Sequence, residues 1–487
     1  MKSLSLCRIE CRQLRHDRVF WATSLLCAAA LLFGFNNGRQ WQTGQDALIA
    51  EYAQQSRQDF EELLNMAKEL RAKNQPPAKT VAERERDPRY ALTLGGMAQH
   101  ICRQNGDLAA LTVGQTDLYN ACILVNAWEV GGAYDERLHR TLENPLRLLF
   151  GRFDAAFAIL TLLPIAILLL TYNQLSAERE LGTLALLGCQ PVPPRRIIAA
   201  RFAVRAAWFV ALTLLPLSLA LWLAEPPADV PSFVAAWGGW LLLSSVYLWF
   251  WFACAFWINS RGNGSAENGL LLAGLWLFLV VVLPGCLNLG LKQWYPLPSR
   301  MAFIDASREA TIEVGKRKSE LLGKYLIDHP DRVPQTRSVN VDDYIQTRLA
   351  LDEETQRVLA PGRAEFTAQQ GRQLQLVERL GFLSPAIVYQ HAVQQLTGQG
   401  QDYQQAFLEA VAEYHQRLRA FYFPKFVQDG PEFSDYQAIP QFRHPPPADA
   451  FRRSNLLAAC VGVGLPSLLL VVAGWRNMRR IRFKVGA

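Results

Sequence analysis

The chain has 487 residues, of which 50% are hydrophobic and 19% charged, and its formal net charge is +7. The apolar residues gather in six windows of about 17 to 26 residues, each long enough to cross a bilayer as a helix. This distribution excludes a soluble globular enzyme, a disordered protein and a fibrous protein. We therefore expect an α-helical integral membrane protein with six transmembrane helices and two mainly helical extracytoplasmic domains.

The excess positive charge lies on alternate connections between the windows. Lys and Arg outnumber Asp and Glu before the first window, between the second and third, and after the sixth. By contrast, segment 36–152 holds 14 basic and 15 acidic residues, and segment 291–454 holds 20 of each. Because loops rich in Lys and Arg remain in the cytoplasm, both termini are predicted to be cytoplasmic and both long segments external. Basic residues that mark topology give no reason to expect a nucleic-acid partner.

The predicted elements begin with an amphipathic helix. Residues 1–18 alternate apolar and basic side chains, a pattern typical of a helix at a membrane interface. The first apolar window follows a long charged segment and has no small-residue cleavage site after it, which favours an uncleaved anchor over a signal peptide. The next segment opens with a helical pattern that ends near Pro76, and Leu108–Gly114 and Asn120–Asn126 are predicted to be short strands.

The second long segment shows helical periodicity in five stretches. They are 301–328, 341–359, 363–380, 384–397 and 402–422, and the Gly-rich string Leu396–Gln401 is predicted to be a turn between the last two. The predicted division of the whole chain is an interfacial helix 1–18, spans 19–35, 153–172, 206–223, 233–258, 268–291 and 455–475, extracytoplasmic domains 36–152 and 292–454, a cytoplasmic coupling region 173–205 and a basic cytoplasmic tail 476–487.

Two cysteines and a group of aromatic residues are further candidates. Cys102 and Cys122 are the only cysteines of the nine in a segment predicted to be external, where a disulfide between them is permitted by the compartment. The alternative is a pair of buried thiols. The fourth span is rich in aromatic residues, which predicts an interfacial belt. The alternative is a lining for an apolar substrate path, with Tyr247, Trp249 and Trp251 as candidates.

Several kinds of chemistry have no support in the sequence. No G-x-x-x-x-G-K-[ST] string is present to cradle nucleotide phosphates, and the seven His show no metal-ligand spacing. Nucleophile motifs of hydrolases are absent. The spans carry no carboxylate or His near their centres, which argues against coupling to an ion gradient. We expect neither an enzyme activity nor a bound metal or cofactor on this chain.

The connection between the second and third spans has an unusual layout. The acidic cluster Glu178-Arg179-Glu180 precedes Gly182-Thr183 and a short apolar run from Leu184, and a Pro-rich turn then leads to Arg195-Arg196. Charged groups beside a sharp turn form a compact knob that can dock into a cleft on a soluble partner. The alternative is an ordinary connection that carries topology charges.

This connection resembles the hallmark of ABC-2-type exporter permeases, an E-R-E-x-G-T-L run followed by a P-x-x-R turn. The match falls on Glu178, Glu180, Gly182, Thr183, Leu184, Pro191 and Arg195. Three further stretches, Glu143–Phe157, Leu383–Gly398 and Tyr436–Pro447, resemble the permease subfamily catalogued as domain-of-unknown-function family 3526, which has the same two large insertions. This sequence departs from the wider family at Pro193-Pro194, where a small polar residue is common before the Arg.

The resemblance implies a function, partners and site residues. It implies the permease subunit of an ATP-driven exporter in a bacterial inner membrane, with ATP and Mg²⁺ held by a separate ABC ATPase dimer. It also implies a second permease subunit, as homo- or heterodimer, within the lipid bilayer, and periplasmic proteins as further candidate partners. The ATPase-coupling residues would be Glu178, Arg179, Glu180, Gly182, Thr183, Leu184, Arg195 and Arg196. The alternative function is a membrane sensor or assembly scaffold whose extracytoplasmic domains bind a ligand or partner protein.

Overall fold

The computed structural model describes residues 2–75, 98–114, 121–128, 130–131, 152–184, 186, 190, 192–224, 229–296, 300–330, 344–428, 438–444 and 449–480. Within these ranges the chain is mostly helical, as expected of an α-helical membrane protein. Six helical units there are long and apolar enough to cross a membrane, by length and composition. They are Arg18–Ala72, Ala155–Glu180, Pro194–Ala224, Val230–Asn259, Ser265–Trp294 and Leu456–Arg479, and each overlaps one predicted window.

The N-terminal part consists of two helices joined by a sharp corner. Helix α1 (Lys2–Arg15) stops before Asp17, whose Oδ1 accepts a hydrogen bond from Phe20 N at 3.0 Å and so caps α2 (Arg18–Ala72). Helix α2 continues without a break for 55 residues. The predicted first span and the helical pattern after it are therefore one helix, because no proline interrupts the polar stretch before Pro76.

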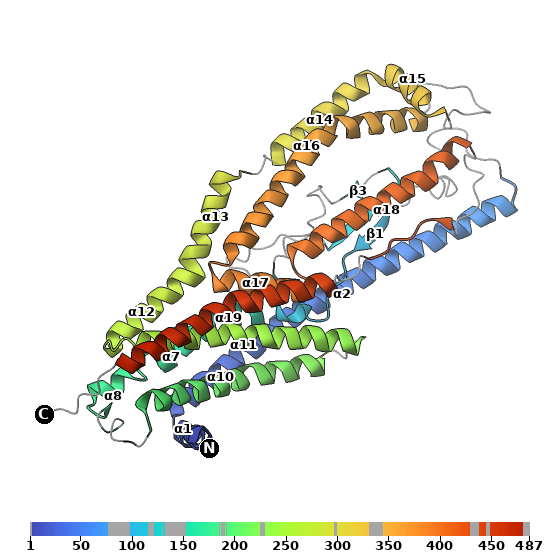
Figure 1. The fold of residues 1–487 in the computed structure, drawn as a ribbon. Helices are drawn as coiled ribbons and strands as arrows, with labels where there is room; N and C mark the ends of the chain where they lie inside the picture. Colours follow the sequence, from blue (N-terminus) through green and yellow to red (C-terminus); the bar gives the residue numbers. More distant parts are fainter. Residues whose placement is uncertain are drawn as a thin grey trace.

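The remaining units, called spanning units below for their length and apolar composition, pack into a bundle around α11 (Val230–Asn259). Its neighbours are α7 (Leu163–Thr171), α10 (Pro194–Ala224), α12 (Ser265–Leu277) and α19 (Asp449–Arg480). Besides Phe233, six aromatic side chains of α11 are buried: Trp240, Tyr247, Phe250, Trp251, Phe252 and Phe256. An interfacial belt needs outward-facing rings, so that prediction is wrong for these six, whereas Trp249 is 42% exposed. Figure 1 shows α11 between α10 and α19.

Two spanning units contain a π-helical turn. In the second unit, η4 (Ala158–Leu162) lies between α6 (Ala155–Phe157) and α7. In the fifth unit, η5 (Phe278–Val282) lies between α12 and α13 (Leu283–Trp294). Each π turn is followed directly by a Leu-Pro pair, and a proline in a helix removes one hydrogen bond and displaces the preceding carbonyl.

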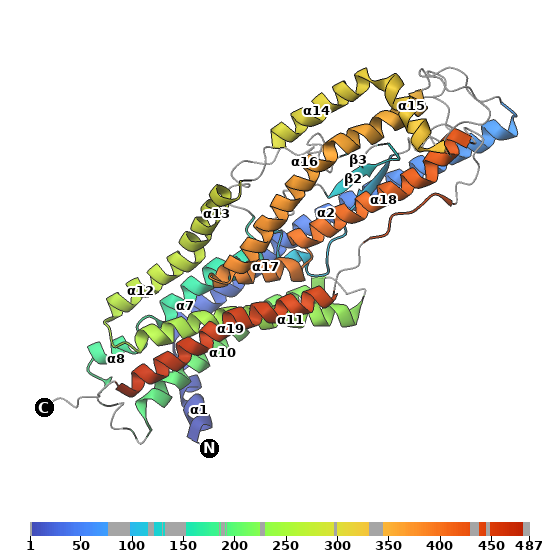
Figure 2. The ribbon, with the colours of Figure 1, turned by 45° about the horizontal axis from the view of Figure 1, so that its top comes forward.

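The second half of α2 leaves the bundle and supports a separate structure, called the head below. The head also contains an antiparallel sheet of β1 (Gln99–Cys102), β2 (Cys122–Val125) and β3 (Val130–Gly131), in the order β1-β2-β3. Its helices are α14 (Arg300–Lys316), α15 (Lys318–Asp328), α16 (Tyr344–Gly381) and α18 (Gln401–Gln428). Figure 2 shows α18 running beside α2, and α14 and α15 arching over the far end of α16.

The head has its own apolar core. It is formed by residues of the sheet, α15, α16 and α18, with Phe407, Val411 and Tyr414 of α18 at most 1% exposed. The predicted helices 341–359 and 363–380 are one helix, α16, which contains Pro361, and the predicted helix 301–328 breaks at Arg317. The strand predicted for Asn120–Asn126 is present as β2.

Two short elements join the head to the bundle. The strand predicted for Leu108–Gly114 is wrong: Ala109–Leu111 form a 3-10 turn, η1, which packs against α2. The contact is so close that a Cβ on Gly38 of α2 would lie 2.1 Å from the Ala110 carbonyl oxygen. Helix α17 (Pro385–Leu396) packs against α11 and α19, and Tyr389 and Val393 are fully buried in the core of the bundle. The turn predicted after it is present at Gly398, with φ of 69°.

Candidate functional site

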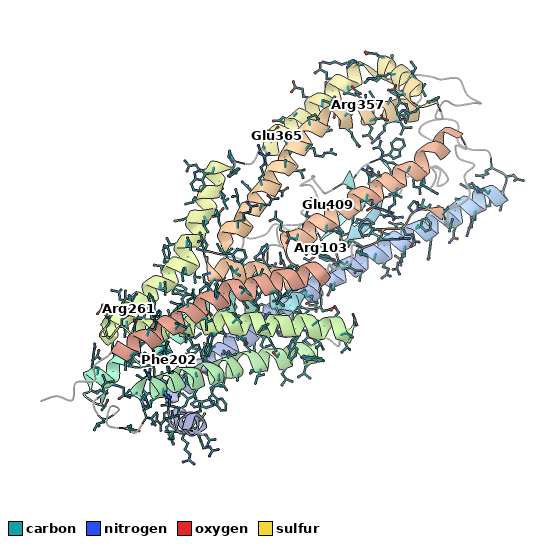
Figure 3. The ribbon with its side chains drawn as sticks, in the orientation of Figure 1. Arg103, Phe202, Arg261, Arg357, Glu365 and Glu409 are labelled. Atoms are coloured by element: carbon teal, nitrogen blue, oxygen red, sulfur yellow. A yellow bond between two sulfur atoms is a disulfide. The ribbon has the colours of Figure 1, made fainter. Side chains whose placement is uncertain are left out.

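The predicted coupling region lies at the end of the bundle opposite the head. Helix α8 (Ser176–Glu180) and the start of α10 are close to α1 at this end. Figure 3 labels Phe202 and Arg261 here, and Arg357, Glu365 and Glu409 on the head. Residues 185, 187–189 and 191 lie outside the described residues. Position 191 is the proline on which part of the resemblance rests.

Glu178 takes part in a cluster of charged groups between three helices. Its Oε1 lies 3.0 Å from Arg201 Nη1 of α10, and Arg201 Nε lies 3.5 Å from Glu10 Oε2 of α1. The three side chains are 26%, 14% and 8% exposed, respectively. Burial raises the pKa of Glu10, and the nearby Arg201 opposes that rise. The hydroxyl of Thr183 donates to the Glu178 carbonyl at 3.0 Å and also to its carboxylate, which closes the turn after α8.

Glu180 is held by the first residue of α12. Ser265 N donates to Glu180 Oε1 at 2.7 Å, and Ser265 Oγ donates to Oε2 at 2.8 Å. A carboxylate at this position satisfies a free N–H of the helix and faces the positive end of the helix dipole. A second contact, 2.8 Å between the hydroxyls of Ser176 and Ser265, also joins α8 to α12. Both carboxylates of the predicted coupling cluster are therefore bound by neighbouring helices, Glu178 partly buried and Glu180 at the exposed surface.

The outward side of the knob carries apolar and basic groups. Leu181 and Leu186 are 77% and 68% exposed, and Arg179 and Arg196 are exposed as well. Gly182 has φ of 75°, a conformation that favours glycine, and it turns the chain between Leu181 and Thr183. The arrangement presents two leucines and two cations on one end of the bundle.

The other predicted coupling residues are packed against neighbouring helices. Leu184 is half-buried against the core of the bundle. The guanidinium of Arg195 lies 5.7 Å from the ring centroid of Trp475 on α19, within the range of a cation–π contact. Leu184 and Arg195 thus help to fix the knob, whereas Arg196 remains exposed.

A cavity of about 320 Å³ lies beside the charged cluster. It is lined by Glu10, Gln13, Leu14, His16, Asp17, Glu178, Arg201, Val204 and Arg205. Arg205 Nη1 is 3.0 Å from Asp17 Oδ2, so both arginines of the lining are paired with carboxylates. Among the described residues, no group of three or more His, Cys, Asp or Glu side chains is arranged to hold a metal ion. The cluster is suited to joining α1, α8 and α10.

Sequence reasoning missed Glu10, Arg201 and Ser265 as partners of the knob. Glu10 carries a signal, because it is the one acid among residues 2–16, a segment rich in basic and apolar residues. A lone acid on the buried side of such a helix indicates an internal cation. Ser265 gave no comparable signal, since a serine at the start of a helix is expected as a cap in any case.

The predicted pairing of Cys102 and Cys122 is present in the structure. The two residues are opposite each other on β1 and β2 and form a disulfide. The aromatic candidates for a substrate path divide: Tyr247 and Trp251 are fully buried inside the bundle, and Trp249 faces outward. The predicted substrate path stays a prediction.

Comparison with known families gives one match. Residues 300–445 match a family described as Domain of unknown function (DUF3526). The match covers the head helices α14, α15, α16 and α18 together with α17, and it includes Leu383–Gly398. No curated protein matches the chain significantly. The chain is thus similar, over a minority of its length, to a family without an assigned function.

Proposed function

We propose that this chain is the membrane-spanning permease subunit of an ATP-driven ABC-2-type exporter in a bacterial inner membrane. It would couple hydrolysis by a separate ABC ATPase dimer to movement of a substrate across the membrane. The observation that carries the proposal is the firm attachment of the knob to several helices, through Glu178 to α10 and α1 and through Glu180 to α12. A push on the exposed face of the knob would move these helices together.

The exposed face of the knob supports a protein partner. The exposed side chains at this end, two leucines and two arginines beside Glu180, combine apolar and charged groups, and such a surface fits a cleft with apolar and charged groups of its own. The sequence offers no phosphate-binding loop, so ATP and Mg²⁺ would be held by the partner ATPase.

The proposed orientation is supported by two independent observations. The charge pattern of the loops predicts the knob and both termini to be cytoplasmic. The disulfide between Cys102 and Cys122 lies in the head, and disulfides persist in oxidising compartments such as the periplasm. Both observations favour a periplasmic head, where periplasmic proteins would be able to bind.

A second permease subunit is part of the same proposal. The fifth spanning unit and α19 present outward-facing apolar side chains such as Leu270, Phe278, Leu465 and Leu469. Lipid or a second permease subunit would cover them. Six spans are half of a typical exporter, in line with the resemblance described above.

The test is co-purification of a tagged chain from native membranes in mild detergent, followed by mass spectrometry and an ATPase assay. The informative variants are Leu181→Ser and Arg179→Glu, because both side chains are exposed and their replacement leaves the buried contacts intact. The control is Ile327→Ser on the head, where the side chain is 81% exposed. We expect a P-loop ATPase to co-purify with the parent and the control but not with the knob variants.

Other outcomes would count against the exporter. An ATPase retained equally by the knob variants would place the contact elsewhere. Recovery of a periplasmic or receptor protein without any ATPase would favour the sensor or scaffold function. Charge reversal at Glu178 is less informative, since it would set a cation against Arg201 and disturb the fold.

A further inference from the structure

The π turns and the prolines that follow them leave specific backbone carbonyls without their usual donors. In η5, Leu283 N donates to the Phe278 carbonyl, so the Leu279 carbonyl loses its donor four residues on, and residue 284 is a proline without N–H. In η4, the donor that an α-helix would supply to the Leu160 carbonyl is Pro164, which also lacks N–H. A carbonyl without a partner in an apolar surrounding is strongly disfavoured.

Side-chain hydroxyls supply the missing donors. Ser384 Oγ donates to the Leu279 carbonyl at 2.7 Å, and Tyr247 OH donates to the Leu160 carbonyl at 2.9 Å. Ser384 is the N-cap of α17, and its Oγ also accepts from Ile387 N. Tyr247 belongs to α11. One carbonyl in each π turn is therefore satisfied by a residue from another element.

A single short helix connects the two contacts. Tyr389, one helical turn after the start of α17, stacks on Tyr247 with ring centroids 4.6 Å apart and an interplanar angle of 27°. Its hydroxyl lies 3.1 Å from Ser244 Oγ on α11, and both tyrosines are fully buried. Helix α17 also packs against η4, η5, α11 and α19. It thus contacts η5 directly through Ser384 and fixes the ring that completes η4.

We propose that α17 is a latch that holds the second and fifth spanning units in their π-helical form. Docking of α17 and the two π turns form one cooperative unit, and release of α17 removes a hydroxyl donor from η5 and the support of the donor at η4. Both spanning units can then shift their hydrogen-bond register, because π turns are local insertions that occur at functional hinges. This inference goes beyond the proposed exporter function and does not depend on a partner ATPase.

The latch can be tested by amide hydrogen exchange of the full-length protein in lipid nanodiscs, read by mass spectrometry. Tyr389→Phe removes one hydroxyl and keeps the stacked ring, and Tyr247→Phe removes the hydroxyl bonded in η4. Thr213→Val is the matched control, since Thr213 Oγ1 donates to the Phe209 carbonyl at 2.7 Å within α10, away from α17. Slow exchange in the spans is followed over days.

For Tyr389→Phe we expect exchange about fivefold faster in α17 and, together with it, in residues 158–163 and 278–283, since one hydrogen bond is lost. For Tyr247→Phe we expect the same rise in residues 158–163. The control leaves all three segments unchanged. The latch is overturned if Tyr389→Phe accelerates α17 alone, if none of the segments changes, or if the control raises them equally. Unchanged exchange in the head shows that each variant is folded.

Discussion

Replacing Arg201 by methionine tests whether the charged cluster at the knob is a structural joint. The substitution keeps an unbranched side chain and removes the cation between Glu178 and Glu10. The two carboxylates then lose the cation between them, and the nearby Arg205 is already paired with Asp17. At an effective dielectric constant near 20, a charge pair at 3.0 Å is worth about 5 kcal/mol before desolvation is subtracted. Because Glu178 is partly exposed, we expect a net loss of about 2–3 kcal/mol.

The loss should depend on pH. Burial already raises the pKa of Glu10, and removal of Arg201 takes away the stronger of the two cations that oppose the rise, the other being Arg205. An acid whose pKa is raised in the folded state contributes stability below its unfolded pKa, and this contribution disappears as the pH rises through the folded pKa. Arg201→Met is therefore expected to be less damaging at pH 5 than at pH 8.

The assay is thermal unfolding of the purified protein in detergent, followed by tryptophan fluorescence. A loss of this size lowers the midpoint by several degrees. Arg308→Met is the control, because its ion pair with Asp305 spans 4.0 Å with side chains 75% and 67% exposed and should contribute almost nothing. Neutralising the whole cluster, with glutamines at positions 10 and 178 and methionine at 201, should restore most of the stability. Equal midpoints for the two single variants would refute the reasoning.

Three further predictions concern the junction and the head. Gly38→Ala should displace η1 and lower the unfolding midpoint, whereas Gly44→Ala on the same helix, with no atom within 4 Å, should raise it slightly. Serine in place of Cys102, or of Cys122, opens a loop of 20 residues and should destabilise the head by about 3 kcal/mol, seen as earlier proteolysis of the head. Burial lowers the pKa of His415 in the folded state. Its contribution to stability is therefore present above the unfolded pKa of about 6.5 and is lost as the pH falls below it. In unfolding midpoints measured from pH 7.5 to 5.5, His415→Gln should reduce this loss of stability in acid.

Contrary outcomes are equally clear for these three. Equal unfolding midpoints for the two glycine variants would contradict the close contact between Gly38 and η1. Unchanged proteolysis of the serine variants under oxidising conditions would mean that the disulfide does not stabilise the head. An acid loss that persists in the glutamine variant would have to come from other groups.

Local signals in the sequence were sufficient to predict where the helices lie along the chain. They were insufficient to predict which elements these helices contact. Apolar windows predicted the spanning units because burying a backbone in lipid demands long apolar helices. The same periodicity located α17 but could not show that its apolar face meets α11 rather than the head. A 3.6-residue period marks a buried face and leaves its partner open.

The candidate site shows the same division. The sequence singled out Glu178 and Glu180, yet their partners lie far away along the chain, on α1, α10 and α12. Contacts of this range depend on how the helices assemble, and no local pattern encodes them. The strand predicted at Leu108–Gly114 failed for the same reason, since close packing on Gly38 selected a 3-10 turn over an extended chain.

The unbroken helix α2 also has a mechanical consequence. From Gly38, where η1 packs against it, to Ala72 at its far end, the helix extends for about 50 Å. A tilt of about 5° in the bundle would carry that end through roughly 4 Å on this rod. Because the helix is continuous and touches β1 of the head, a motion of the bundle is transmitted to the head without a flexible joint between them.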